Sequence, residues 1–193
     1  MKLSFLRPLA ALLLTLGLAA CGGKASYDVS GTVSNLNNNG LILANGGEEL
    51  PIAAGQTSFT FKKRIDYGTD YNITFKQQPA HMTCGISGGS GSAGHYINIS
   101  AAVSCSQNTY SVSGTISGLT VDGLVLINGN VTTIVAKDAK TFTLSGAVAD
   151  GTTYGVGVST QPKGLLCVVQ PGTGAGTMGS ANVTNVQIAC NPV

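Results

Sequence analysis

Five cysteines are the residues of this 193-residue chain best suited to chemistry. One stands alone at Cys21, and four lie later in the chain, at Cys84, Cys105, Cys167 and Cys190. The simplest pairing joins Cys84 to Cys105 and Cys167 to Cys190, because the second cysteine of each pair alternates with apolar residues and should face a core. A disulfide that closes a loop of roughly twenty residues stabilises a fold by about 3 kcal/mol through loop-closure entropy.

Histidine and tyrosine side chains gather in the first half of the chain. The residues that we single out as a possible binding surface are Tyr67, Tyr71, His81, His95 and Tyr96. Rings with a polar tip are suited to contacts with proteins or sugars. A metal site built from His81 and Cys84 is the rival to the disulfides, but Gly164 occupies the position equivalent to His81 in the second half. We therefore expect no metal and no cofactor.

Several short motifs resemble catalytic or nucleotide-binding signatures. Residues 89–94 and 174–179 match G-x-G-x-x-G, and residues 85–89 match G-x-S-x-G. Both signatures need a helix after the motif, and no helical pattern follows any of the three. We expect the glycine motifs to be flexible or tightly turned loops. With only two histidines and eight acidic residues, the chain is not expected to be an enzyme.

An internal repeat determines how the chain is organised. Residues 27–84 align without gaps on residues 110–167, with 21 identities in 58 positions. Self-similarity at a fixed offset is the sequence signature of tandem modules. We expect a signal segment over 1–20, a tether over 21–26, and two repeats over 27–107 and 110–193.

Each repeat has the pattern of an all-β domain. Apolar and polar residues alternate around Val29 and Tyr71, and Leu124–Ile127 is a continuous apolar run typical of a strand buried on both faces. Asn45-Gly46 and Asn128-Gly129 favour two-residue hairpin turns. No sustained helical period follows residue 20. The expected fold is two tandem antiparallel sandwiches of immunoglobulin-like or transthyretin-like type.

The charge balance excludes one class of function. Ten Lys and Arg residues against eight Asp and Glu residues give a net charge of +2. Lys2 and Arg7 belong to the signal segment, so the remaining chain has no formal net charge. A broad basic surface is the usual footprint of nucleic-acid binding, and we expect no nucleic-acid partner. The run Lys62–Arg64 is expected to guard a strand edge.

The first 21 residues resemble the signal of bacterial lipoproteins. A positive start precedes twelve apolar residues, too few to span a bilayer as a mature helix, and Leu18-Ala-Ala-Cys21 matches the lipobox. The resemblance implies cleavage before Cys21 and attachment of a diacylglyceryl group and a further acyl chain, such as palmitate, to that residue. Gly22 implies sorting to the outer membrane, where the protein would face the periplasm or the cell surface.

The repeat itself resembles a glycine-rich repeat of exported bacterial proteins. The segments of the second copy that show this resemblance are Gly123–Gly129, Phe142–Leu144, Tyr154–Val156, Gln161–Cys167 and Val183–Cys190. The resemblance implies an architecture and a location, but no activity. We expect a non-enzymatic membrane-anchored lipoprotein that acts as a structural spacer or protein-interaction platform in the cell envelope. The alternative is a carbohydrate or cell-envelope binding module that uses the first repeat.

Overall fold

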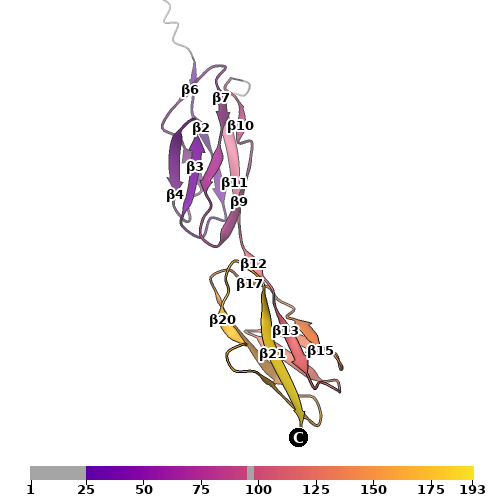
Figure 1. The fold of residues 1–193 in the computed structure, drawn as a ribbon. Helices are drawn as coiled ribbons and strands as arrows, with labels where there is room; N and C mark the ends of the chain where they lie inside the picture. Colours follow the sequence, from indigo (N-terminus) through magenta and orange to yellow (C-terminus); the bar gives the residue numbers. More distant parts are fainter. Residues whose placement is uncertain (1–24, 95–97) are drawn as a thin grey trace, which may run out of the picture.

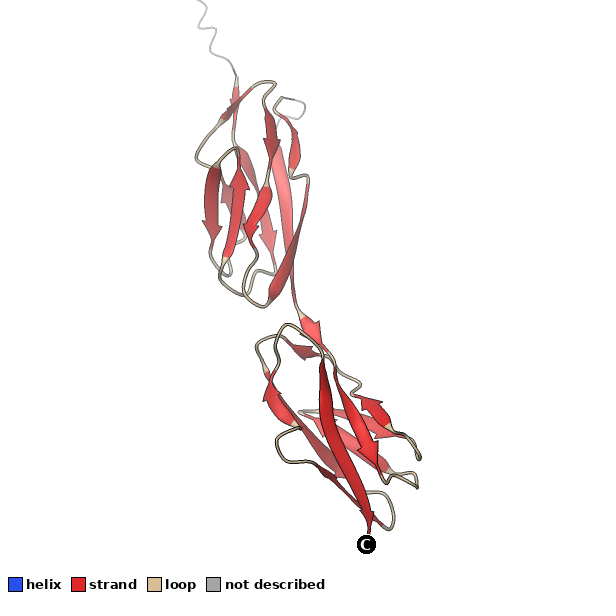
Figure 2. Cartoon of the chain, in the orientation of Figure 1, coloured by secondary structure: helices blue, strands red, loops and turns tan. Residues whose placement is uncertain are grey.

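A computed structural model describes residues 25–94 and 98–193, and these residues form strands and loops without a helix (Figures 1 and 2). The expected all-β fold is confirmed. The signal segment, Cys21, His95 and Tyr96 lie outside the described residues. Over the described ranges, no helix is long and apolar enough to cross a membrane.

The N-terminal half contains eleven strands that form two facing layers. They are β1 (Ser26–Tyr27), β2 (Val29–Ser34), β3 (Leu41–Asn45), β4 (Glu48–Ile52), β5 (Ser58–Thr60), β6 (Ile65–Asp66), β7 (Asp70–Asn72), β8 (Thr74–Gln77), β9 (Met82–Ser87), β10 (Ser90–Ser92) and β11 (Ile99–Gln107). One layer is the sheet β5-β2-β11-β9, and the other contains β4-β3-β8 with the pair β10-β7. A short pair, β1-β6, lies where the chain enters this half (Figure 1).

The C-terminal half repeats this arrangement. Its strands are β12 (Thr109–Tyr110), β13 (Val112–Ser117), β14 (Leu124–Asn128), β15 (Val131–Val135), β16 (Thr141–Thr143), β17 (Val148–Ala149), β18 (Thr153–Thr160), β19 (Leu165–Val169), β20 (Ala175–Thr177) and β21 (Val183–Pro192). The two layers are β16-β13-β21-β19 and β15-β14-β18-β20, and β12 pairs with β17. Figure 1 shows the two halves end to end, joined where β11 leads into β12.

Each half has its own hydrophobic core. The buried cluster of the N-terminal half runs from Val29 to Cys105, and that of the C-terminal half runs from Val112 to Cys190. The alternation of β11, buried at every second residue from Ile99 to Cys105, shows how one strand face fills the core. The expected double burial of Leu124–Ile127 is wrong, because Val125 and Ile127 of β14 are only partly buried.

One layer of each half is mixed, whereas the other is wholly antiparallel. The first long strand of each half lies parallel to the last one, β2 beside β11 and β13 beside β21. The pairing of β13 with β21 shifts register between Val112 and Gly114, opposite Val183 and Val186. This bulge accommodates one residue more in β21 than in β11.

The hairpin turns lie one residue later than the Asn-Gly pairs indicate. Asn45 pairs with Glu48 and Asn128 with Val131, so the turn residues are Gly46-Gly47 and Gly129-Asn130. Both central glycines of the first turn have positive φ, of 54° and 84°, as a type I′ turn requires. The two asparagines end their strands instead, and each side-chain oxygen accepts a backbone hydrogen bond from a strand of its own layer, from Asn72 of β7 and from Gly155 of β18.

The expectation that the two G-x-G-x-x-G motifs are loops is wrong for three residues of each motif, because Ser90–Ser92 and Ala175–Thr177 form short strands. Their middle glycines, Gly91 and Gly176, lie opposite Tyr71 and Tyr154 in β-ladders. A Cβ atom on either glycine would meet the tyrosine ring at about 3 Å. Each glycine is therefore needed so that an aromatic ring can lie across the neighbouring strand.

Candidate functional site

The four later cysteines form the two disulfides expected from the sequence, Cys84–Cys105 and Cys167–Cys190. The partners lie opposite each other on neighbouring strands, β9 with β11 and β19 with β21. All four are buried. The bonds therefore tie together strands of one sheet inside each half.

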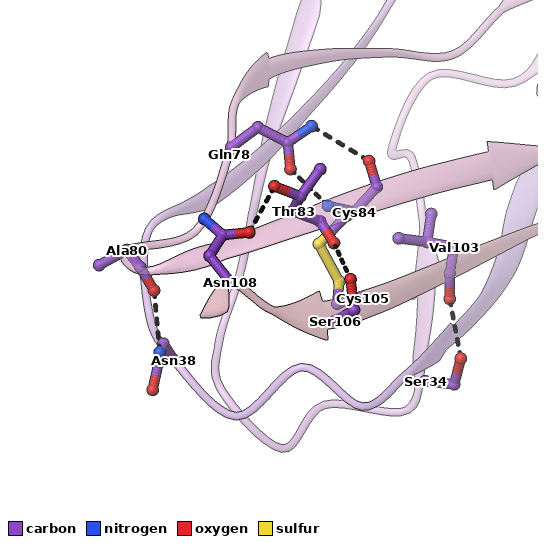
Figure 3. Close-up of a disulfide and its surroundings, with 10 residues drawn as sticks. All are labelled: Ser34, Asn38, Gln78, Ala80, Thr83, Cys84, Val103, Cys105, Ser106 and Asn108. Carbon is purple, nitrogen blue, oxygen red and sulfur yellow. Dashed lines mark hydrogen bonds between the residues drawn. A yellow bond between two sulfur atoms is a disulfide. The ribbon is translucent and has the colours of Figure 1, made fainter. Parts of the chain in front are cut away.

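A glutamine side chain hydrogen-bonds the outward backbone groups of the first cysteine of each disulfide, Cys84 in β9 and Cys167 in β19. The Gln78 side chain accepts a hydrogen bond from the Cys84 N–H at 2.8 Å and donates to the Cys84 carbonyl at 3.2 Å (Figure 3). Gln161 makes the same two bonds to Cys167, at 2.8 and 2.9 Å. The repeated Gln-Pro pairs thus have a structural role, because the amide takes the place of a further strand.

Tyr67 and Tyr71 lie in very different surroundings. Tyr67 is 65% exposed, in the turn between β6 and β7 at the end where the chain enters the N-terminal half. Tyr71 is partly buried, packs against the core and covers Gly91. Because Tyr154 repeats this packing in the other half, Tyr71 is a structural residue of the repeat.

His81 lies at the opposite end of the N-terminal half, in the turn between β8 and β9. Its φ angle is 61°, in the left-handed region that residues with a side chain seldom adopt. The equivalent residue of the other half, Gly164, has a φ angle of 76°. The turn therefore favours glycine, and a histidine is retained in the first copy at a conformational cost.

The His81 side chain reaches the C-terminal half. Its Nδ1 atom lies 3.0 Å from Oδ1 of Asp150, a carboxylate that is only 8% exposed. The imidazole lies over Gly151, where a Cβ atom would come within 3.0 Å of the ring. Such a pair joins a half-exposed imidazole to a buried acid and fixes the orientation of both.

Backbone bonds reinforce this contact along the connecting segment. Asn108 donates its N–H to the His81 carbonyl at 3.0 Å, and its own carbonyl accepts the Asp150 N–H at 2.9 Å. The Gln107 side chain donates to the Asp150 carbonyl at 3.1 Å, and Thr83 donates to the Asn108 side chain at 2.7 Å. We call His81, Thr83, Gln107, Asn108 and Asp150 the junction. Asn108, the one residue between β11 and β12, is therefore hydrogen-bonded to both halves.

Sequence reasoning missed Asp150, because nothing near it in the chain marks it as a partner for His81. A comparison of the two sequence repeats, position by position, could have singled out Asp150. Asp150 occupies the position equivalent to Tyr67, and the Asp150 N–H bond to Asn108 has its counterpart in the Tyr67 N–H bond to Ala25. At this position of the turn, Tyr67 is exposed in the first half, whereas Asp150 is buried beside His81 in the second.

The basic run Lys62–Arg64 is held in place by acidic side chains. The Glu48 carboxylate accepts the N–H groups of Lys62 and Lys63 at 2.8 and 2.9 Å, and Arg64 pairs with Asp28 at 3.1 Å. The two backbone hydrogen bonds, from Lys63 first and then Lys62, lower the pKa of Glu48 below its ordinary value of 4.5. The run thus forms a turn whose backbone is fixed by Glu48 and whose arginine is paired with Asp28.

The proposed binding residues that the structure describes lie apart, and one polar hollow lies elsewhere on the surface. Among residues 25–94 and 98–193, no group of three or more His, Cys, Asp and Glu residues is arranged to hold a metal ion. A hollow of about 480 Å³ beside β1 is lined by polar residues that include Asp28 and Arg64, already paired with each other. The structure does not bring Tyr67, Tyr71 and His81 together in one site.

Comparisons with known proteins identify the fold. No protein-family profile and no curated protein matches the sequence. Among solved structures, the Bacillus anthracis TIE protein superposes with a TM-score of 0.53 at 10% identity, over 86% of this chain and 34% of that one. The chain therefore spans about a third of that protein. Shaft pilin SpaA of Lactobacillus rhamnosus GG matches with a TM-score of 0.31 at 11% identity, over 86% of this chain and 99% of the pilin. The major pilin T3.2 of Streptococcus pyogenes matches with a TM-score of 0.34 at 11% identity, over 88% of this chain and 98% of the pilin. The superposition on the TIE protein agrees with the all-β fold of the described residues.

Proposed function

We propose that this chain is a non-enzymatic spacer of the cell envelope, with two stacked β-sandwich repeats held in line by the junction. The repeats would be residues 27–107 and 110–193, after a signal over 1–20 and a tether over 21–26. The observation that carries the proposal is the junction. A spacer must hold its far end at a defined place, and free rotation between its units would defeat this.

The geometry of the long strands supports a role in setting a distance. β11 has nine residues and β21 has ten, which corresponds to about 30 and 33 Å at the usual rise of an extended chain. Stacked end to end, the two halves would extend roughly 60 Å, about twice the length of either strand. A short tether adds little to this length and keeps the first half near its anchor.

Attachment to the membrane is the second part of the proposal. Cys21 would carry the lipid, and the protein would lie at the outer membrane and face the periplasm or the cell surface. Two or more acyl chains are needed for stable anchoring. Intact-mass measurement of protein extracted from membranes tests this part. We expect a chain that begins at Cys21 and carries acyl groups; an unmodified Cys21 would contradict it.

The alternative function is carbohydrate or cell-envelope binding through the first repeat. Exposed Tyr67 is the specific observation in its favour. Crosslinking pull-down from intact cells separates the two functions. A binding module should lose a captured partner when Tyr67 is replaced by alanine while it stays folded, whereas a spacer should capture the same material with and without this change. Thr69→Ala, in the same turn, is the control for the loss of side-chain volume.

A further inference from the structure

The outer strand β15 of the C-terminal half leaves one side of its backbone without a neighbouring strand. It lies at the end of the sheet β15-β14-β18-β20 (Figure 1). Its side chains are Val131, Thr132, Thr133, Ile134 and Val135, none of them charged. Ile134 is 83% exposed, an unusual exposure for a large aliphatic side chain.

The two-residue turn before β15 shows which backbone groups face outward. Asn128 and Val131 flank the turn and face each other, as a hydrogen-bonded pair does in a two-residue hairpin. Because hydrogen-bonded and non-hydrogen-bonded pairs alternate in an antiparallel ladder, Thr132 and Ile134 point their N–H and C=O groups away from β14. Within the described parts of the chain, the hydrogen bonds of turns and loops do not use either residue.

Three other outer strands among the described residues, β4, β9 and β19, carry features that hinder pairing at the edge. In β4, the equivalents of Thr132 and Ile134 are Glu49 and Pro51, a charge and a residue without an N–H group. Charged residues and proline are the usual means of preventing strands from pairing at an edge. On β9 and β19, the outward groups of the central cysteines are occupied by glutamine side chains. The open edge of β15 is thus a departure from the repeat's own pattern.

We propose that β15 pairs antiparallel with β15 of a second copy of this chain, about a two-fold axis that passes between the two Thr133 residues. Thr132 of each copy then faces Ile134 of the other, so all the outward N–H and C=O groups of both residues are satisfied in one ladder. The two Ile134 side chains become diagonal neighbours on the same face, where they contact each other.

The composition of β15 favours a second copy as the occupant. An uncharged strand can face itself without bringing like charges together, and its two outward residues are spaced symmetrically about Thr133. In β4, the same self-pairing would bring two copies of Glu49 close together and leave an acceptor opposite Pro51 unpaired. The pairing does not depend on the lipid anchor or on the junction.

Sedimentation velocity of the full chain in excess detergent tests the pairing over a range of protein concentrations. We expect a reversible monomer–dimer equilibrium, and we expect Ile134→Pro to raise its Kd roughly tenfold or more. Proline should leave the fold intact, because the repeat carries Pro51 at the same register. Leu166→Thr is the matched control: it removes a half-exposed aliphatic side chain from β19 and should leave the Kd unchanged.

Amide hydrogen exchange identifies the edge directly. In the dimer the N–H groups of Thr132 and Ile134 should exchange at least about tenfold more slowly than in the monomer, with little change on β19. A chain that stays monomeric at high concentration would overturn the proposal. So would a dimer that Ile134→Pro leaves intact, or an edge protected only when a different protein is bound.

Discussion

Replacing His81 with glycine separates two effects that the structure combines in one residue. Glycine adopts the φ angle of 61° without the cost that a side chain brings, which is about 1 kcal/mol for a single residue. The same change removes the hydrogen-bonded contact between the imidazole and the Asp150 carboxylate. A charged hydrogen bond to a buried group contributes about 1.5–3 kcal/mol, and half exposure of the imidazole reduces this to about 1 kcal/mol.

The two effects should therefore appear in different parts of the molecule. His81→Gly should stabilise the N-terminal half by about 1 kcal/mol and weaken its attachment to the C-terminal half by a similar amount. One kcal/mol corresponds to about a fivefold change in an equilibrium constant. Amide exchange resolved by residue can read both changes in one experiment.

We expect the β9 and β11 amides that open only on global unfolding to exchange about fivefold more slowly in His81→Gly, and the amides of Asn108 and Asp150 about fivefold faster. Gly164→His is the matched control, because it introduces the strained side chain in the other half, away from Asp150. That variant should destabilise the C-terminal half by about 1 kcal/mol. Slower exchange at Asn108 and Asp150 in His81→Gly would refute the reasoning.

Four further changes test the account elsewhere in the fold. Gln161→Ala should destabilise the C-terminal half by about 1–3 kcal/mol in urea unfolding, because it leaves the outward N–H and C=O groups of Cys167 without their partner. Replacing Cys84 and Cys105 together with serine should cost about 3 kcal/mol, confined to amides of the N-terminal half, since each half has its own core. Gly114→Ala should cost about 3 kcal/mol or more in thermal unfolding, because the new methyl group would overlap the Val186 carbonyl; unchanged stability would contradict the close approach of β13 and β21. The ionised carboxylate of Glu48 accepts the two N–H bonds, so its contribution to stability is complete above pH 4.5 and is lost as the pH falls through the lowered pKa. Amide exchange at Lys62 and Lys63 should accelerate in that pH range in the native chain. Glu48→Gln should show no such step.

The parts of the fold that could be predicted from the sequence are those that the repeat and the alternation express locally. Cys105 alternates with Val103 and Ala101, and all three are buried on the same face of β11. The disulfide partners follow from the same regularity. In each case, a short stretch of chain contains the information that decides which side chains point inward.

The features that could not be predicted depend on residues far apart in the chain. Gly91 is one of many glycines, and only its position opposite Tyr71 explains it. His81 looked like a binding or metal residue because the sequence does not show that its turn needs a left-handed backbone or that Asp150 lies within reach. The parallel pairing of β2 with β11 likewise joins strands separated by most of the half.

The height of the chain's far end above a membrane tests the central claim most directly. A fluorescent donor at Val193 of the full chain, reconstituted in vesicles that contain a lipid acceptor, reports the distance between the C-terminus and the bilayer. Stacked halves predict weak energy transfer, consistent with roughly 60 Å, and stronger transfer in a double variant His81→Gly, Asp150→Ala that removes the side-chain contact of the junction. Strong transfer in the native chain, with no change in the double variant, would contradict a spacer held in line.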